Sequence, residues 1–309
     1  MPAKWFQCPD AERIEIDRCL KPGGCRMPRR CATIPYLRLV GFDRKWQGVS
    51  PSSAGNGPRV LYLKATTDYT IDPDSRVWAS IGTGTHGKLS IHQYTSNVLS
   101  EEKLSDDDMT GIADVLQADE NKQGWYILDD YKTWGSYKLM KALGISVEKE
   151  EETVLDDNEK PVILKSGPNK GQPKTKTNTR IIKEPALADL RVEELQLNRY
   201  RIFFEEKGFP ISRMEIQAIP RDGGTWIAKS RGIDRNLYMI GIRRMENKAV
   251  IQFYKTLSDQ VNEAFKTGYI RLCNLWEAWE GRRRCESHCE VSEACKAMSK
   301  KKGEKWGII

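Results

Sequence analysis

The chain has 309 residues, of which 39% are hydrophobic and 30% charged, and this predicts a globular protein with a sizeable core. No apolar run approaches the roughly 20 residues of a membrane-spanning helix, and the first residues, MPAKWFQCPD, lack the apolar stretch of a secretory signal. We therefore expect a cytoplasmic protein with no membrane partner. The net charge of +7 suits a polyanion, because phosphate contacts release counterions, although such a charge also serves solubility alone.

The first half of the chain predicts a cysteine-rich segment followed by the start of a core. Residues 1–50 are basic and rich in cysteine, and PSSAGNGP (51–58) is typical of a linker. Alternating apolar residues around the turn 120–123 indicate two paired strands. The elements expected here are a strand at 59–66, a helix at 76–98, strands at 114–119 and 124–132, and a helix at 136–143 that ends before Gly144.

The second half predicts an insertion, two further strands and two long helices. The insertion, residues 146–184, is first acidic and then basic, and it is either a hairpin over a substrate channel or a solvated surface loop. The elements expected are strands at 162–165 and 180–183 within the insertion, a helix at 186–207, strands at 214–222 and 236–244, and a helix at 247–267. Residues 51–268 should therefore form an α/β core with a mixed central sheet flanked by helices, followed by a cysteine group and a basic tail at 269–309.

Two acids and a lysine on the predicted strand pair suggest phosphodiester chemistry. Asp114 and Asp130 offer the oxygen ligands that Mg²⁺ and Mn²⁺ prefer, and Tyr131 can add its backbone carbonyl. Such a cation activates a water and neutralises charge on phosphate oxygens. Lys132 should share a strand face with Asp130, where its ammonium can orient the water or stabilise the developing charge.

An acid two residues before a lysine is a weak signal by itself. We interpret the remaining copies as solvated charge pairs: Asp43/Lys45, Glu101/Lys103, Glu120/Lys122, Glu205/Lys207 and Glu246/Lys248. The Asp130/Lys132 copy differs because it ends an apolar strand and follows the strand that contains GIAD (111–114). A hairpin with acids at its rim is the alternative.

Three other side chains are candidates for the same site. His86, in IGTGTHGKL, could join the metal ligands through a neutral imidazole, which would favour Mn²⁺, or it could be a partly buried helix histidine. Gln196 and Tyr200 lie one helical turn apart, so both point from one helix face. They suit contacts with DNA, through hydrogen bonds and stacking, although an amphipathic helix would show the same spacing.

The ordered strings GTGTH, GIAD, DYK and QLNRY resemble the RecB-type exonucleases of the PD-(D/E)XK superfamily. The similarity covers residues 75–225 and is greatest to AddB-like nuclease domains and to the CRISPR-adaptation exonucleases that carry an iron–sulfur cluster. It implies a PD-(D/E)XK core and a divalent-metal DNA exonuclease. The implied roles are metal ligation by His86, Asp114, Asp130 and the Tyr131 carbonyl, catalysis by Lys132, and DNA contact by Gln196 and Tyr200.

The cysteines lie only at the two ends of the chain, and clustered thiols in a reducing compartment favour metal over disulfides. They are Cys8, Cys19, Cys25 and Cys31 in the first group and Cys273, Cys285, Cys289 and Cys295 in the second. Each group could close its own four-thiolate site. Alternatively, one N-terminal cysteine joins three C-terminal ones, as the resembled family implies. Because four thiols would then remain unused, we expect a [4Fe–4S] cluster that involves the C-terminal group and a zinc site near the N-terminus.

The leading hypothesis is a Mg²⁺- or Mn²⁺-dependent DNA exonuclease that acts on single strands or DNA ends. The alternative is a nuclease-like module that binds DNA or a protein partner without cutting. A recombination or replication protein is a candidate partner for either.

Overall fold

The computed structural model describes residues 3–42, 46–92, 97–106 and 109–303, so residues 304–309 of the expected basic tail lie outside the described part. The chain divides into two compact units. The first unit contains residues 1–130, 191–215 and 241–309, and the second contains residues 131–190 and 216–240. Within the described ranges, no helix has the length and apolar character needed to cross a membrane.

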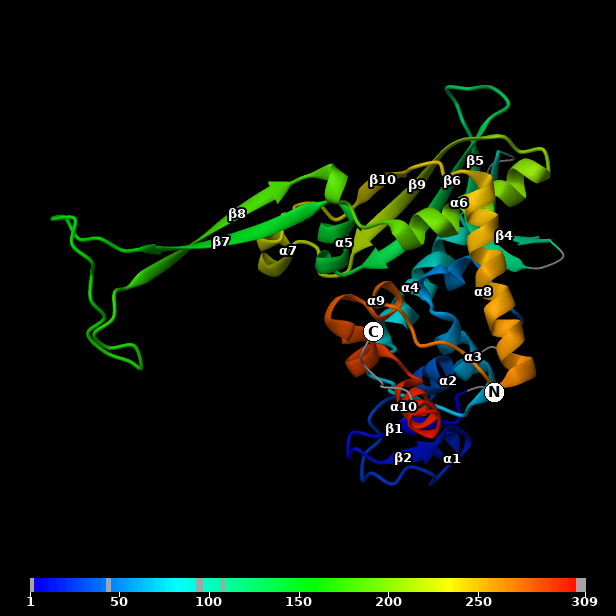
Figure 1. Ribbon diagram of the computed structural model, residues 1–309, viewed down its shortest axis with the longest axis horizontal. Coiled ribbons are helices and arrows are strands. Elements are labelled where there is room, and N and C mark those ends of the chain that lie inside the picture. Colours follow the sequence, from blue (N-terminus) through cyan, green and yellow to red (C-terminus); the bar gives the residue numbers. More distant parts are fainter. Residues whose placement is uncertain (1–2, 43–45, 93–96, 107–108, 304–309) are drawn as a thin grey trace. The chain divides into compact units, whose positions relative to one another are not determined.

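The protein is mixed α/β, with a five-stranded sheet in the order β10-β9-β6-β5-β4 (Figure 1). These strands are β4 (Val98–Ser105), β5 (Thr110–Ala118), β6 (Tyr126–Trp134), β9 (Ile211–Pro220) and β10 (Tyr238–Ile242). Strands β4, β5 and β6 run antiparallel. Tyr126 N donates to Pro210 O at 2.9 Å near the start of both β6 and β9, and Arg221 N donates to Trp134 O at 2.7 Å near their ends. Strands β6 and β9 are therefore parallel and the sheet is mixed.

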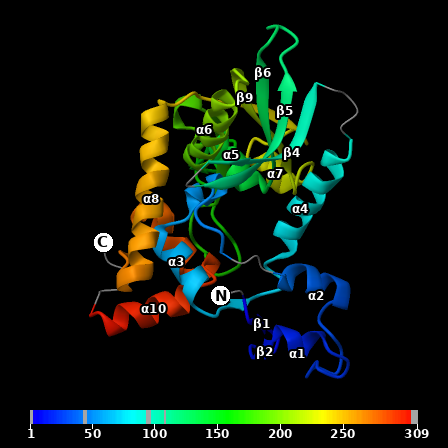
Figure 2. The same cartoon turned by 90° about the vertical axis from the view of Figure 1, so that its right-hand side faces the viewer.

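Two long helices of the first unit, α6 (Arg191–Glu206) and α8 (Asn247–Thr267), pack against each other. Figure 2 shows α8 beside α6, and it also shows α4 (Val77–Ser90) alongside β4. Helix α6 buries Ile202, Phe203 and Phe204 almost completely. Helix α8 ends at Gly268, whose φ of 69° is the left-handed conformation that favours glycine after a helix. The expected helices in these two regions are confirmed.

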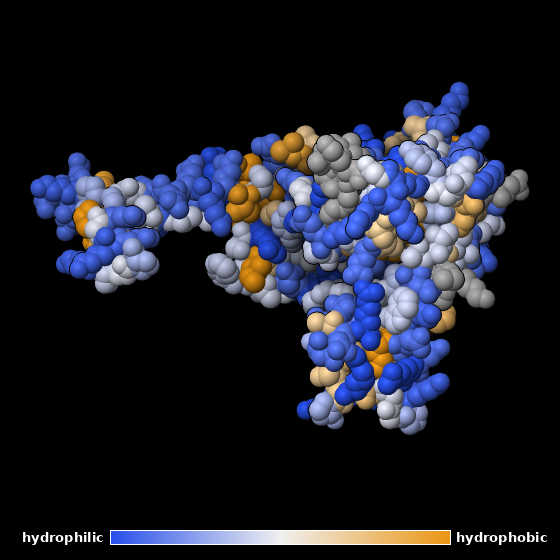
Figure 3. Space-filling model, turned by 60° about the horizontal axis from the view of Figure 1, so that its bottom comes forward, coloured by the Kyte–Doolittle hydropathy of each residue, from blue (hydrophilic) through white to orange (hydrophobic). Residues whose placement is uncertain are grey.

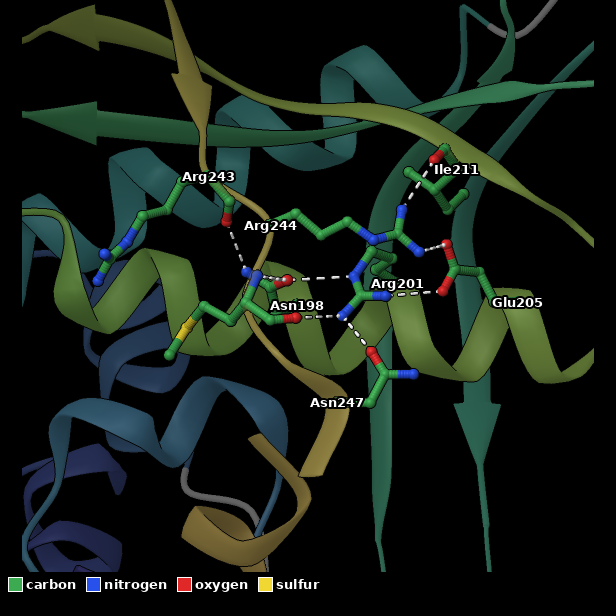
Figure 4. A network of polar contacts seen from close by, with 8 residues as sticks. Asn198, Arg201, Glu205, Ile211, Arg243, Arg244 and Asn247 are labelled. Atoms are coloured by element: carbon green, nitrogen blue, oxygen red, sulfur yellow. Dashed lines mark hydrogen bonds and ion pairs between the residues drawn. The ribbon is translucent and has the colours of Figure 1, made fainter. Parts of the chain in front are cut away.

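A buried arginine fixes α6 to the chain that leads into α8 (Figure 4). Arg201 is fully buried, and its guanidinium donates to Glu205 Oε2 at 2.7 Å, to Asn247 Oδ1 at 2.7 Å and to Met245 O at 3.0 Å. Asn198, one turn earlier, accepts from Arg201 Nε at 3.1 Å. Because a buried cation is costly without partners, this network favours a single orientation of α6.

The two ends of the chain share one apolar core in the first unit. Phe6, Ile14, Leu37 and Ile71 from the N-terminal part are buried in the same cluster as Val291 from the C-terminal part. The elements are β1 (Trp5–Gln7), β2 (Arg13–Glu15), β3 (Thr70–Ile71), α1 (Ile16–Leu20), α2 (Ile34–Gly41), α3 (Pro58–Thr66), α9 (Leu275–Ala278) and α10 (Ser292–Lys301). Strand β1 pairs antiparallel with β2 and parallel with β3.

The second unit contains two short helices, α5 (Ser136–Ala142) and α7 (Trp226–Ser230), and a long hairpin. The hairpin pairs β7 (Ile145–Thr153) with β8 (Thr175–Lys183), and its outer part carries almost only exposed residues. Figure 3 shows this arm as largely hydrophilic. The expected helix at 136–143 is confirmed, and Gly144 has the left-handed φ of 64° that its position after the helix requires.

Two secondary-structure expectations were wrong, and the helix expected at 76–98 ends at Ser90, since Val98 already begins strand β4. Residues 59–66 form helix α3 rather than a strand, because Pro58 opens the helix and packing buries Val60, Leu61 and Leu63 on more than one side. Residues 162–165 are not the strand that pairs with 180–183. Strand β7, which contains the acidic run EKEEE, takes that place. Cross-strand pairs such as Glu148 with Arg180 offset the charge of that run.

Candidate metal-dependent active site

Three carboxylates lie in a row across strands β4, β5 and β6 of the first unit. The residues on either side of Glu101 pair with the residues on either side of Asp114, so Glu101 lies across from Asp114. On the next strand Val115 is opposite Asp129, and one further step along that register places Asp130 across from Asp114. Opposed residues share a face of the sheet, and like charges in such positions repel. The row therefore favours a bound cation.

The backbone at Glu101 has a φ of 54°, a left-handed conformation inside strand β4. For a residue other than glycine this conformation costs about 1–3 kcal/mol, and it persists only where the surroundings enforce it. Such residues cluster at ligand sites. The strain at Glu101 therefore supports a functional rather than a structural role for its carboxylate.

Helix α4 brings a histidine to the same acids. His86 Nδ1 lies 3.4 Å from Asp114 Oδ2, and ligand atoms of His86, Glu101 and Asp114 all lie within 4.8 Å of one another. The Asp114 side chain is 10% exposed and that of His86 is 28% exposed, so the group is partly shielded from water but still accessible. One imidazole nitrogen with carboxylate oxygens suits Mn²⁺ and related divalent ions. Asp130 is in the row but does not belong to this close group of three.

Helix α6 holds the third carboxylate of the row. Asp130 is 2% exposed, and its Oδ1 accepts a hydrogen bond from Gln196 Nε2 at 3.0 Å. Burial raises the pKa of Tyr200 well above its usual value, and the charges of Asp130 and Asp114 raise it further. Tyr200 therefore keeps its proton at neutral pH, so its hydroxyl remains a hydrogen-bond donor near two carboxylates.

The glycine of the GIAD string makes room for this tyrosine. A Cβ added to Gly111 would come within 2.7 Å of a ring carbon of Tyr200 and within 2.8 Å of Pro51. Only glycine permits that approach without a shift of the ring or of the backbone. The string therefore has a packing role at Gly111 and a chemical role at Asp114.

The remaining predicted residues, Tyr131 and Lys132, lie on the same strand as Asp130 but belong to the second unit. Strand β6 continues through Trp134, and side chains alternate along a strand, so Asp130 and Lys132 project on the same side of β6. Both Tyr131 and Lys132 are half-buried.

Glu101 is the site residue that sequence reasoning missed. Its string, an acid two residues before Lys103, was interpreted as a solvated charge pair, and Glu101 is indeed exposed. The register of β4 against β5 gives the residue its place across from Asp114. Residues 98–105, VLSEEKLS, do not alternate between apolar and polar residues, so the sequence offered no local signal for this strand.

A candidate cluster site between the C-terminal cysteines

All four C-terminal cysteines line one cavity of the first unit. Burial, with the charges of Glu277 and Cys295, raises the pKa of Cys273 to about 12. Burial also raises the pKa of Cys285 and of Cys289. These three thiols therefore hold their protons in the absence of metal, and metal binding has to displace those protons.

Arginines surround this cavity. Arg59, Arg282 and Arg284 line it together with the four cysteines. Arg59 is fully buried and donates to Ser299 Oγ at 2.8 Å and to Cys295 O at 3.2 Å. Four thiolates around a zinc ion or a [4Fe–4S] cluster leave a net negative charge, which buried cations stabilise.

Gly57 lies directly against the cavity. A Cβ at this position would be 2.7 Å from Cys273 Sγ and 2.8 Å from a carboxylate oxygen of Glu277. The linker before α3 thus needs glycine to pass close to the thiol.

The four N-terminal cysteines form a separate group. Burial raises the pKa of Cys19, and the thiols of Cys25, Cys8 and Cys31 raise it further, so the four lie near one another. Arg30 opposes this effect, with Nη1 4.0 Å from Cys19 Sγ. The apolar core that contains Cys19 also has Cys8, Cys273, Cys289 and Cys295 packed against it, so cysteines from both ends of the chain border one core.

No protein-family model matches this chain, and no curated protein matches it.

Proposed function

We propose that the protein is a divalent-metal-dependent DNA exonuclease that hydrolyses phosphodiester bonds in single-stranded DNA or at DNA ends. The observation that supports it most is the row of Glu101, Asp114 and Asp130 with His86 3.4 Å from Asp114. A row of opposed acids is unfavourable without a cation, and the donor set suits Mn²⁺ or Mg²⁺. The resemblance to RecB-type PD-(D/E)XK exonucleases supports the same chemistry.

Each side chain of the site has a role in this proposal. The ion, when bound, supplies an activated water and neutralises charge on the phosphate. His86, Glu101, Asp114, Asp130 and the Tyr131 carbonyl would hold it. Gln196 keeps the Asp130 carboxylate in place through its 3.0 Å hydrogen bond. Tyr200 is only 3% exposed, so its hydroxyl would act on the carboxylates of Asp114 and Asp130 rather than on DNA as expected from the sequence. Lys132 supplies a positive charge beside the reacting phosphate.

The cysteine groups complete the proposal as metal sites. We assign a [4Fe–4S] cluster to the C-terminal cavity. All four C-terminal cysteines line one cavity with three arginines, and this lining suits the negative charge of a thiolate-bound cluster. We assign a zinc ion to the N-terminal cysteines.

Cleavage of end-labelled DNA tests the function. The wild type should degrade single-stranded DNA with Mn²⁺ or Mg²⁺ and should lose this activity in EDTA. Lys132→Ala and Asp130→Asn should each lose about 100-fold or more, because each removes charge at the reacting phosphate. Lys207→Ala is the matched control, since Lys207 follows Glu205 in another acid-x-lysine string but is exposed at the end of α6.

Two other results are informative. Equal cleavage by the wild type and Lys132→Ala would contradict the catalytic assignment. DNA binding without metal-dependent cleavage on any substrate would favour the non-catalytic module.

A further inference from the structure

Exposed aromatic side chains gather on the short helices of the second unit. Trp226, the first residue of α7, is 80% exposed, and Tyr137 on α5 is 38% exposed. The ring of an exposed tryptophan is costly to leave in water. Apolar residues are visible near the start of the arm in Figure 3, although the arm itself is hydrophilic.

The two segments that carry these rings are mostly basic, although the exposed Asp189 also lies beside α5, where its backbone oxygen accepts from Lys138 Nζ at 3.3 Å. Residues 131–144 and 221–232 together contain six basic residues and one acid. Lys141 Nζ lies 5.4 Å from the centre of the Tyr137 ring, and the Arg231 guanidinium lies 5.7 Å from it. Lys138 Nζ lies 5.4 Å from the centre of the Trp134 ring. Cations beside exposed aromatic rings suit a nucleic acid, because its phosphates can contact the cations and its bases can stack on the rings.

The single acid in these segments does not offset the positive charge, because its carboxylate is committed inside the unit. Asp222 accepts from Ser136 N at 2.7 Å and from Ser136 Oγ at 2.6 Å, at the start of α5. Arg231 Nη1 donates to the same Ser136 Oγ at 2.8 Å. This contact fixes the segment after α7 against the start of α5, and the two helices pack together. The rings are therefore carried on a rigid support.

We propose that Tyr137 and Trp226, with Lys138, Lys141, Lys229 and Arg231, form a surface that binds single-stranded DNA by base stacking and phosphate contact. This proposal rests on the proposed nuclease function in one respect: the stacking surface follows Lys132, the proposed catalytic lysine, in the sequence. Four residues lie between Lys132 and Tyr137, so these two residues are at most about 18 Å apart along the chain. DNA held on Tyr137 is therefore within a few nucleotides of the proposed catalytic lysine.

The test is the binding of fluorescent oligo(dT) by the full-length protein in EDTA, where cleavage is blocked. Trp226→Ala and Tyr137→Ala should each raise the Kd at least about fivefold, which is the low end of the effect expected when one base loses its stacking partner. Trp226→Phe keeps an aromatic ring and should stay within about twofold of the wild type. Lys229→Ala should lower the slope of log Kd against log salt by about 0.7, as expected for one lost phosphate contact to a single strand.

Tyr269→Ala is the matched control, because Tyr269 is 63% exposed and has Lys302 Nζ 4.7 Å from its ring, but lies in the first unit. It should bind oligo(dT) like the wild type. Unchanged binding by both Trp226→Ala and Tyr137→Ala would overturn the proposal. An equal loss on a blunt duplex would also overturn it, since paired bases cannot stack on these rings.

The outcome is separable from that of the nuclease proposal. Weakened binding by the variants of a protein that never cuts DNA would support the stacking surface and reject the nuclease. Metal-dependent cleavage by a protein whose Trp226→Ala and Tyr137→Ala variants bind DNA normally would support the nuclease and reject the stacking surface.

Discussion

At Glu101, backbone strain and charge repulsion occur in the same residue. The left-handed φ of 54° costs free energy, and the carboxylate lies across from Asp114. Neither cost brings a packing benefit, because Glu101 is exposed. A bound cation converts the repulsion into shared ligation. Glu101 therefore stabilises the folded protein only when a metal is bound, whereas a core residue such as Leu116 stabilises it without metal.

Glu101→Gln should separate the two effects. Without metal, removal of one charge from the row should raise stability by about 0.2–1 kcal/mol. With Mn²⁺ the wild type should gain thermal stability through binding to the folded state, and Glu101→Gln should gain less. Thermal unfolding with EDTA and with a series of Mn²⁺ concentrations measures both. Glu102→Gln, one residue on and facing the other way, is the control. Equal Mn²⁺ stabilisation of all three proteins would remove Glu101 from the site.

At the scale of elements, α5 depends on a carboxylate from elsewhere in the second unit. Its N-cap residue is Gly135, which has no side chain to accept from the first turn. Asp222, after β9, provides that acceptor to Ser136 N at 2.7 Å. Partial burial would raise the pKa of Asp222, but the hydrogen bonds from Ser136 outweigh this and lower it below the usual value.

The stability that Asp222 contributes should therefore depend on pH. A carboxyl group whose pKa is lowered by folding stabilises the protein above its unfolded pKa of about 3.9, and this contribution is lost as pH falls through the folded value. Asp222→Asn should reduce stability by about 1 kcal/mol at pH 7, a modest figure because the group is partly exposed. The difference from the wild type should shrink below about pH 4. Urea unfolding at both pH values measures this. A difference that is constant with pH would show that the charge of Asp222 is irrelevant.

The sequence predicted those elements whose signals are local. The apolar periodicity of α6 and α8, the turn between β5 and β6, and the glycine after α5 all depend on neighbouring residues. Helix α3 was missed because its apolar residues form one short run, Val60 to Leu63, and burial on several sides removed the helical stripe. The place of Glu101 was missed because a cross-strand register joins residues that are distant in sequence. The two cysteine groups were recognised in the sequence, but only the structure shows that all four C-terminal cysteines line one cavity with Arg59.

At the scale of the whole chain, the C-terminal cysteine cavity joins segments more than 200 residues apart. Arg59 of α3 lines it and hydrogen-bonds to the backbone of Cys295 and to Ser299. The apolar core beside it combines the first 71 residues with Val291. Metal bound by the four thiols would therefore hold the last segment of the chain against the first. Because the unfolded chain lacks such a site, metal binding adds directly to the free energy of unfolding.

Cysteine substitutions should test directly how the two groups of thiols share the bound metal. Cys289→Ser, in protein purified without oxygen, should abolish the iron content and lower the Tm by roughly 5–10 °C, the effect of losing a few kcal/mol. Cys19→Ser should leave the iron unchanged and remove any zinc, because Cys19 lies among the N-terminal thiols. If instead one N-terminal cysteine ligates the cluster, Cys8→Ser or another N-terminal variant should lose iron together with Cys289→Ser, while Cys273→Ser should retain it. Metal analysis and unfolding of these variants therefore decide between two self-contained sites and one site shared by the two ends.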